Sequence, residues 1–236
     1  MKLAIERTLF GFNDGIDTIN VLNDKFTPLS ILLNRLLSEK YTGKKIKYLN
    51  LFFYETSEKL QKAYGKDYFL HYYGGQFTYK KVINYNYFLG LSFNGQKHFI
   101  WKEAYNMLQF AGDELKNYNL KESSEYAFNT GLQLNLNADF RMLETDITLF
   151  EEKYKASLWL NFTEENMEAN FTLEKDNEIL LNKLVHSGSN GMEFFLVMFK
   201  KIESKGNSIF IRATKDLSYL PLQINFAKKA GKVEFS

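Results

Sequence analysis

The sequence predicts an α+β protein with an antiparallel sheet dominating the C-terminal half, an N-terminal helix and a central helix pair. Apolar residues recur every three or four positions in two stretches, and they alternate with polar residues through most of the last hundred positions. The chain has 236 residues, 45% hydrophobic and 25% charged, the balance of a folded globular protein. No repeat or Pro/Gly/Ser-rich linker is visible. We therefore expect one compact domain over 1–236, with a soft boundary near 120–140 between a mixed αβ half and a β-rich half.

The first elements follow from capping and spacing. Pro28 is suited to the first position of a helix that ends near Tyr41, with Thr27 as its N-cap. A largely buried strand is predicted over 45–55, because apolar residues dominate there. A short helix follows over 57–64 and ends at a glycine.

Two glycine turns predict hairpins. Gly74-Gly75 joins a strand over 67–73 to one over 76–84, since both glycines accept positive φ. Asn94-Gly95 is the stronger turn signal of the two, and predicts strands on both of its sides, over 87–93 and from Gln96 onward.

The central helix pair follows from the spacing of apolar residues after Trp101. These residues predict a first helix over about 101–118. Asn119, with Glu122 three residues later, has the spacing of a capping box and predicts a second helix over about 120–131.

The last hundred residues are predicted to be mainly β. One segment, 192–202, is apolar on both faces, which is typical of a central strand. Only 178–186 is compatible with a helix. The other predicted strands cover 141–149, 156–162, 169–173, 209–214, 222–226 and 232–235.

The net charge of +2 conceals a block pattern. Residues 1–99 carry 14 basic and 8 acidic groups, residues 100–180 carry 7 and 16, and residues 181–236 carry 9 and 4. An acidic block speeds association with a basic partner. Charge runs are also what an ordinary solvated face looks like.

The leading hypothesis is a non-catalytic binding protein, for example an inhibitor or immunity protein whose acidic middle region engages a basic protein partner. Tyrosine, with 15 copies, is a residue type enriched at interface hot spots. The expected partner-binding residues are Glu144, Asp146, Glu151, Glu152, Glu164 and Glu165.

A single-stranded nucleic-acid binder is the alternative. Aromatic side chains on a sheet beside basic residues are how single strands are bound. The aromatic and basic residues around the Gly74-Gly75 turn fit this description, and the expected contacts are Tyr68, Tyr72, Phe77, Tyr79, Lys80 and Lys81.

Catalytic and cofactor chemistry finds little support in the sequence. There is no cysteine, and the three histidines His71, His98 and His186 are far apart along the chain. We expect no catalytic residue, metal site or cofactor, although a hydrolase site assembled from distant residues stays open, as does cation binding by Glu144 and Asp146. No signal-peptide core and no apolar run near 18 residues is present, so a cytoplasmic protein without a membrane span is expected.

Overall fold

The computed structural model describes residues 5–13, 18–43, 46–191, 195–213, 220–229 and 232–235. The chain groups into two compact units, Met1–Ala138 and Asp139–Ser236. Together they form the predicted α+β fold, with antiparallel sheets in the C-terminal half and helices α1, α4 and α5 in the N-terminal half.

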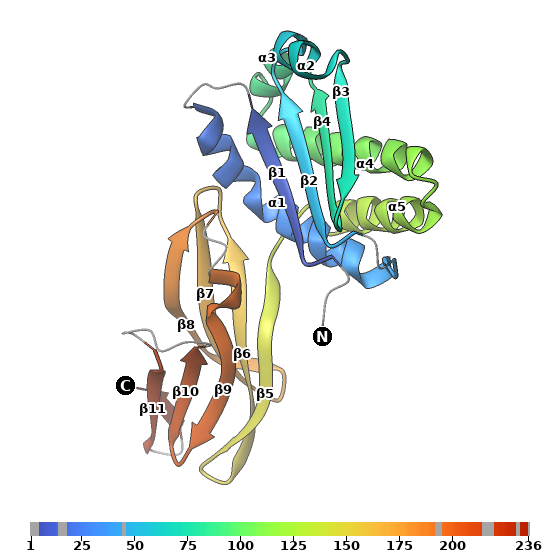
Figure 1. Ribbon diagram of the computed structural model, residues 1–236. Coiled ribbons are helices and arrows are strands. Elements are labelled where there is room, and N and C mark those ends of the chain that lie inside the picture. The colour runs from blue at the N-terminus through green and yellow to red at the C-terminus, as the bar shows by residue number, and fades with distance from the viewer. Residues whose placement is uncertain are drawn as a thin grey trace. The chain divides into compact units, whose positions relative to one another are not determined.

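The N-terminal unit is a four-stranded mixed sheet with the long helices α1 and α4 on one side (Figure 1). The strand order is β1-β2-β4-β3, in which β1, β2 and β4 are parallel and β3 is antiparallel to β4. Helix α1 is the long crossover that the parallel pair β1 and β2 requires. The elements are β1 (Arg7–Asn13), α1 (Thr18–Lys40), β2 (Tyr48–Tyr54), α2 (Ser57–Tyr64), β3 (Tyr68–Tyr73), β4 (Gln76–Val82), α3 (Tyr85–Leu89), α4 (Phe93–Glu114) and α5 (Tyr118–Gln133).

The predicted Gly74-Gly75 hairpin and the short helix before it are confirmed. Gly74 and Gly75 have φ of 57° and 86°, which glycine adopts without strain. Tyr73 pairs with Gln76 across the turn, as the predicted register requires. Gly65 ends α2 in the left-handed conformation.

Helix α1 begins ten residues before the predicted start at Pro28, which lies inside the helix. The earlier turns are held by the sheet, because Asn23 Oδ1 accepts a hydrogen bond from the backbone N–H of Phe12 at 2.6 Å and Phe26 is fully buried. Thr27 is not a cap, since its hydroxyl donates to the carbonyl of Asn23.

The predicted hairpin at Asn94-Gly95 is wrong. Ser92 Oγ accepts a hydrogen bond from the N–H of Gly95 and caps α4, so the two residues lie in the first turn of a helix. His98 is consequently on a helix and not on a strand. Helix α5 is capped by Asn117, two residues before the predicted cap.

The C-terminal unit contains two antiparallel sheets, β5-β6-β7-β8 and β9-β10-β11-β12, with β5 lying beside β9 (Figure 1). Their apolar faces are buried, for example at Leu158 and Phe171 in one sheet and at Ile209 and Ile224 in the other. The elements are β5 (Phe140–Leu149), β6 (Glu152–Phe162), β7 (Asn166–Lys175), β8 (Glu178–Ser189), α6 (Phe195–Met198), β9 (Phe199–Lys205), β10 (Ser208–Ala213), β11 (Leu222–Lys229) and β12 (Lys232–Phe235).

Two sequence predictions fail in this unit. The segment 178–186 is not a helix but most of β8, which begins after a tight turn with positive φ at Asp176 and Asn177. The apolar segment 192–202 is not a central strand. Its described part holds the short helix α6 followed by β9, which is the outer strand of its sheet, and Phe195 and Met198 are buried through α6. Met192 and Thr214 lie outside the described residues.

Candidate functional site

The two faces of the N-terminal sheet differ in what covers them. On one face, helices α1 and α4 pack directly on the strands: Thr8 bonds to Asn34 of α1, and the rings of Tyr68 and Tyr79 contact Phe110 of α4. Within the described part of the chain, the ring and side-chain contacts of the opposite face involve only α2 among the helices. We call this opposite face the open face.

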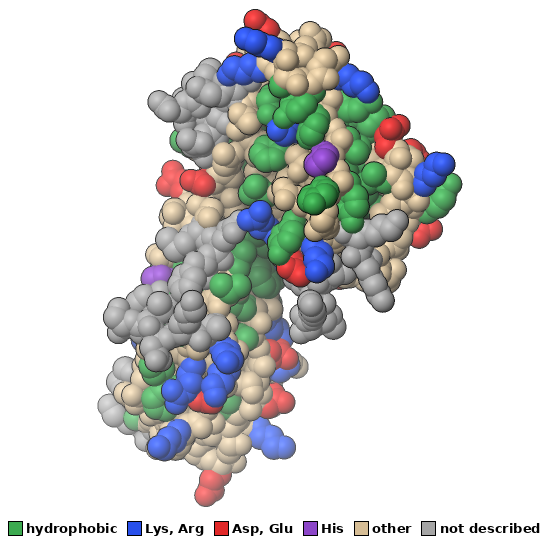
Figure 2. Space-filling view, in the orientation of Figure 1, with side chains coloured by type: hydrophobic (Ala, Val, Ile, Leu, Met, Phe, Trp, Pro, Cys, Tyr) green, Lys and Arg blue, Asp and Glu red, His purple; other side chains and the backbone are tan. Residues whose placement is uncertain are grey.

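The open face is defined by the strand register. It carries Arg7, Leu9 and Gly11 of β1, Tyr48, Asn50 and Phe52 of β2, Gln76, Thr78 and Lys80 of β4, and Phe69, His71 and Tyr73 of β3. Figure 2 shows hydrophobic side chains gathered over these strands with a histidine among them. Tyr73 is 79% exposed, and contiguous exposed apolar surface of this kind marks interaction sites.

A column of parallel rings runs along β3 on this face. The ring of Tyr64, from α2, stacks on Phe69 with centroids 4.0 Å apart. Phe69 and His71 follow at 5.8 Å and 21°, and His71 and Tyr73 at 6.5 Å and 20°. Alternate residues of a strand share a face, so Phe69, His71 and Tyr73 of β3 all contribute a ring to the column. Such a surface can stack planar groups.

Lys80 places a positive charge among these rings. Its Nζ lies 5.7, 5.2 and 5.5 Å from the ring centroids of Phe52, Tyr64 and Phe69, and it donates a hydrogen bond of 3.0 Å to the Tyr64 hydroxyl. Burial alone would lower the pKa of Lys80. The hydrogen bonds and charge interactions with Tyr64 and Tyr54 outweigh burial and raise the pKa, so the cation is retained.

Asn50 lies in the middle of the open face with one end of its amide unpaired. Its Nδ2 reaches Thr78 Oγ1 at 3.4 Å, whereas its buried Oδ1 has no hydrogen-bond partner. The side chain is only 4% exposed. An unpaired buried acceptor costs about 1–3 kcal/mol and is rare in native structures.

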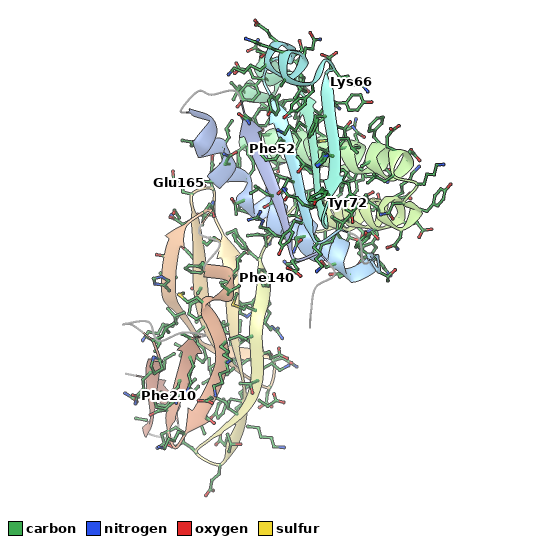
Figure 3. The ribbon with its side chains drawn as sticks, in the orientation of Figure 1. Phe52, Lys66, Tyr72, Phe140, Glu165 and Phe210 are labelled. Atoms are coloured by element: carbon green, nitrogen blue, oxygen red, sulfur yellow. The ribbon has the colours of Figure 1, made fainter. Side chains whose placement is uncertain are left out.

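The aromatic residues predicted from the sequence lie mostly on the covered face. Phe77 is fully buried, Tyr79 is 5% exposed, and Tyr68 packs on α4. Burial, together with the negative charge that Tyr68 and two nearby glutamates can carry, raises the pKa of Tyr79 to about 12. Tyr72 is half-exposed, at the lower end of β3 in Figure 3.

The two predicted lysines are separated by the sheet. Lys81 forms an ion pair of 2.6 Å with Glu103 of α4, on the covered face. Lys80 is the one residue of the predicted nucleic-acid set that lies on the open face. In the sequence of β3, Phe69, His71 and Tyr73 alternate with the residues of the covered face. This second set of ring-bearing residues was the sequence signal that would have identified the open face.

The six predicted acidic residues do not form one surface. Glu151 and Glu152 lie at the turn joining β5 to β6, whereas Glu164 and Glu165 lie at the turn joining β6 to β7 (Figure 3). These turns are at opposite ends of β6, whose 11 residues span about 35 Å. Glu152 is paired with Lys175 at 2.7 Å.

Glu144 and Asp146 share a face of β5, and both are exposed. Glu144 forms an ion pair with Arg141 and lies 3.9 Å from Lys155, which is also the register partner of Asp146. Basic groups therefore surround the carboxylates. Among the described residues, no group of three or more His, Asp or Glu side chains is placed to hold a metal ion.

No protein-family model matches this sequence, and no curated protein and no solved structure shows significant similarity to it. None of the helices in the described ranges combines the length and apolar content needed to cross a bilayer.

Proposed function

We propose that this chain is a non-catalytic binding protein whose open face binds single-stranded nucleic acid. The observation that carries the proposal is the column of stacked rings from Tyr64 to Tyr73 with the Lys80 cation beside it. Unpaired bases stack on such rings with about 1–3 kcal/mol per base, without a strong sequence requirement.

The charges on the open face fit a phosphate backbone. Arg7 lies over the Tyr48 ring at 5.9 Å, on the edge strand β1, whereas Tyr73 lies on the opposite edge strand, β3. Arg7 and Tyr73 lie in one cross-strand row, whereas Lys80 lies further along β4, in the row of Gly11, Phe52 and Phe69. A nucleic-acid strand that runs obliquely across the sheet would meet a cation on β1 and another on β4 while its bases reach the rings of β3. Basic groups beside aromatic platforms are the combination that single-strand binders use.

Asn50 offers a place for base discrimination. An asparagine amide pairs with the donor and acceptor edge of adenine in a bidentate way. A base amine that displaced the covering side chains would supply the donor that Oδ1 lacks.

Fluorescence anisotropy with labelled 12-nucleotide strands tests the proposal. We expect single-stranded oligo(A) and oligo(U) to bind at low salt, and a duplex of matching length to bind more weakly because its bases are already stacked. The logarithm of the binding constant should fall with log[salt] at about 0.7 per phosphate contact. No binding at about 100 μM protein, the weak end of non-specific affinities, would end the proposal.

A second proposal is that the acidic turns of the C-terminal unit engage a basic protein partner, as an inhibitor would. It rests on Glu151 and Glu165, which are exposed at strand turns and have no neighbouring cation in the described ion pairs. Because the two turns are far apart, a partner of ordinary interface size would contact one end of the unit.

A further inference from the structure

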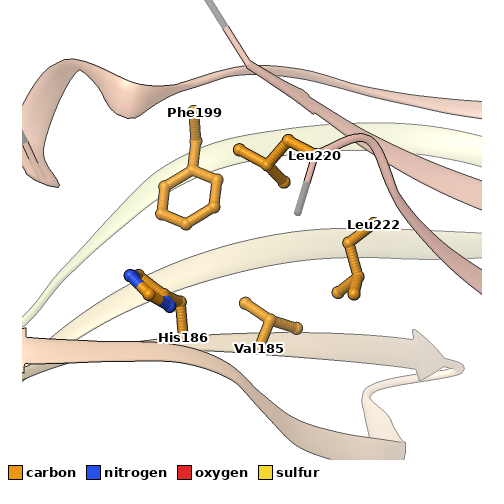
Figure 4. Close-up of a pocket in the computed structure, with 5 residues that line it drawn as sticks. All are labelled: Val185, His186, Phe199, Leu220 and Leu222. Carbon is orange, nitrogen blue, oxygen red and sulfur yellow. The ribbon is translucent and has the colours of Figure 1, made fainter. Parts of the chain in front are cut away.

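The C-terminal unit holds a cavity between its two sheets, on the side of β8 and β11. The cavity has a volume of about 310 Å³, and the described residues that line it are Val185, His186, Phe199, Leu220 and Leu222. Figure 4 shows Val185 and His186 pointing from one sheet toward Phe199 and Leu222 of the other sheet and toward Leu220, which precedes β11. This volume is at the lower end of the range for small-molecule sites.

A β-bulge in β8 directs both residues into the cavity. Asn170 of β7 pairs with Leu184, and the next residue, Ala169, pairs with His186, so Val185 is an extra residue in the ladder. In a regular strand, only alternate side chains point to one face. A bulge changes the direction of a side chain, so that two consecutive residues can point to the same face. Leu184, directly before the bulge, is 52% exposed on the outer face. Across the ladder, Ala169 contributes only a methyl group opposite His186 and so leaves room.

The chemistry of the wall favours an apolar occupant. Protein interiors contain few voids larger than a water molecule, because the atoms lining a void lose their packing contacts. A bound water requires two to four polar partners. Among the described lining residues, four side chains are hydrocarbon, and only the His186 ring has polar atoms.

The His186 ring, which is this one polar group, is held in place by a neighbouring ring. The His186 ring stacks on Phe195 with centroids 5.3 Å apart and planes 12° from parallel, so the ring lies against a fully buried neighbour. The cavity is partly open to solvent, and Val185 and His186 in its wall are half-buried.

We propose that this cavity binds a small aliphatic molecule with one hydrogen-bonding head group, of the class of a medium-chain carboxylic acid or alcohol. The chain would lie between Phe199 and Leu222, with the head group at the His186 ring. The site is independent of the open face, so neither proposal depends on the other.

Isothermal titration of the full chain with decanoate and decanol tests this site. We expect wild-type protein to bind at least one of them and to show a raised Tm in its presence. Val185→Trp, which fills the cavity, should weaken binding more than tenfold. Leu184→Trp, which adds the same ring on the outer face of the same strand, should leave binding unchanged. A preference for decanoate that disappears in His186→Leu would assign the head group to the carboxylate.

Far-UV circular dichroism checks that each variant folds. If Val185→Trp does not fold, Leu222→Trp fills the cavity from the other sheet and should give the same loss. Absence of binding of both ligands to the wild type, or unchanged binding by a folded cavity-filling variant, would overturn the proposal.

Discussion

The ring of Phe52 lies over Gly11, so closely that a Cβ atom on Gly11 would stand 2.3 Å from Cδ1 of Phe52. The two residues are register partners on adjacent strands β1 and β2. The absence of a side chain on Gly11 therefore lets the phenyl ring lean across β1. In that position the ring also lies 5.7 Å from the Lys80 ammonium group, on the same face of the sheet.

Gly11→Ala should weaken nucleic-acid binding without removing any ring or charge. The added methyl group forces the Phe52 ring away from its position, because contacts below 3.0 Å between such atoms are not tolerated. The displaced ring disturbs the surroundings of Lys80. We expect a several-fold loss of affinity in the anisotropy assay, with the protein still folded by circular dichroism. Wild-type affinity in the folded variant would show that Phe52 is not part of the binding surface.

Gly131→Ala should destabilise the N-terminal unit, although alanine is the better helix former by about 1 kcal/mol. The new methyl group would stand 2.3 Å from Cζ2 of Trp101, which is 1% exposed and donates a hydrogen bond of 3.2 Å to the carbonyl of Phe128. Overpacking of a buried site costs about 1–3 kcal/mol. Thermal unfolding should show a lower Tm.

Gly112→Ala is the matched control for that substitution. Its methyl group would stand 2.2 Å from Cγ of Lys121, whose side chain is 31% exposed, and 3.3 Å from the backbone carbonyl oxygen of Asn117. The partly exposed lysine side chain can move more easily than the buried Trp101 ring, so Tm should fall less than in Gly131→Ala. Equal losses in the two variants would contradict the tight contact between α4 and α5 at Trp101.

Tyr79 should make the protein less stable as the pH rises through the interval from 10 to 12. Burial, the largest cause, raises the pKa of its hydroxyl to about 12, whereas an unfolded tyrosine titrates near 10. Above pH 10 the unfolded chain therefore releases a proton that the folded chain retains, which favours unfolding. Urea unfolding at pH 9 and pH 11 should show a smaller loss in Tyr79→Phe than in the wild type. Tyr87→Phe, at a 56% exposed position, should lose as much as the wild type. Identical pH dependence in Tyr79→Phe and the wild type would contradict the raised pKa.

Charge reversals distinguish the two acidic turns of the C-terminal unit. If a basic protein partner binds at the turn joining β5 to β6, Glu151→Lys should weaken its association, and Glu165→Lys should not. The reverse result would place the partner at the other turn. Surface plasmon resonance with a candidate partner at two salt concentrations provides the measurement. Binding that neither reversal nor salt affects would remove the electrostatic basis of this proposal.

Local chemistry accounts for the elements that the sequence predicts well. The Gly74-Gly75 turn and the end of α2 at Gly65 require positive φ, and glycine provides it whatever surrounds it. Alternation likewise identified β5, β6 and β7, whose buried faces point toward the other sheet.

The failures arise where a distant part of the chain, or a competing local signal, decides the structure. Asn94-Gly95 has the composition of a hairpin turn, but the hydroxyl of Ser92 caps a helix there instead. Residues 178–186 form a strand because β7 pairs with them, and the tight turn at Asp176 and Asn177 was the local signal for it.

The candidate site shows a similar limit. The alternation in β3 and β4 gives two faces, and the sequence assigned the aromatic binding surface to the face of Phe77 and Tyr79. Only the position of α1 and α4 shows that this face is covered and that the face of Phe69, His71 and Tyr73 is open. That position depends on long-range packing, which a single sequence does not reveal.

Comparison of Tyr73→Ala with Tyr118→Ala in the anisotropy assay tests the central claim most directly. Both tyrosines are highly exposed, 79% and 74%, but Tyr73 ends the ring column on the open face whereas Tyr118 begins α5. We predict that Tyr73→Ala lowers the affinity for a single-stranded 12-mer by about 5- to 150-fold, the loss of about 1–3 kcal/mol of stacking. Tyr118→Ala should bind as the wild type does. Equal affinity of the two variants, or a larger loss in Tyr118→Ala, would contradict the assignment of the open face as the binding surface.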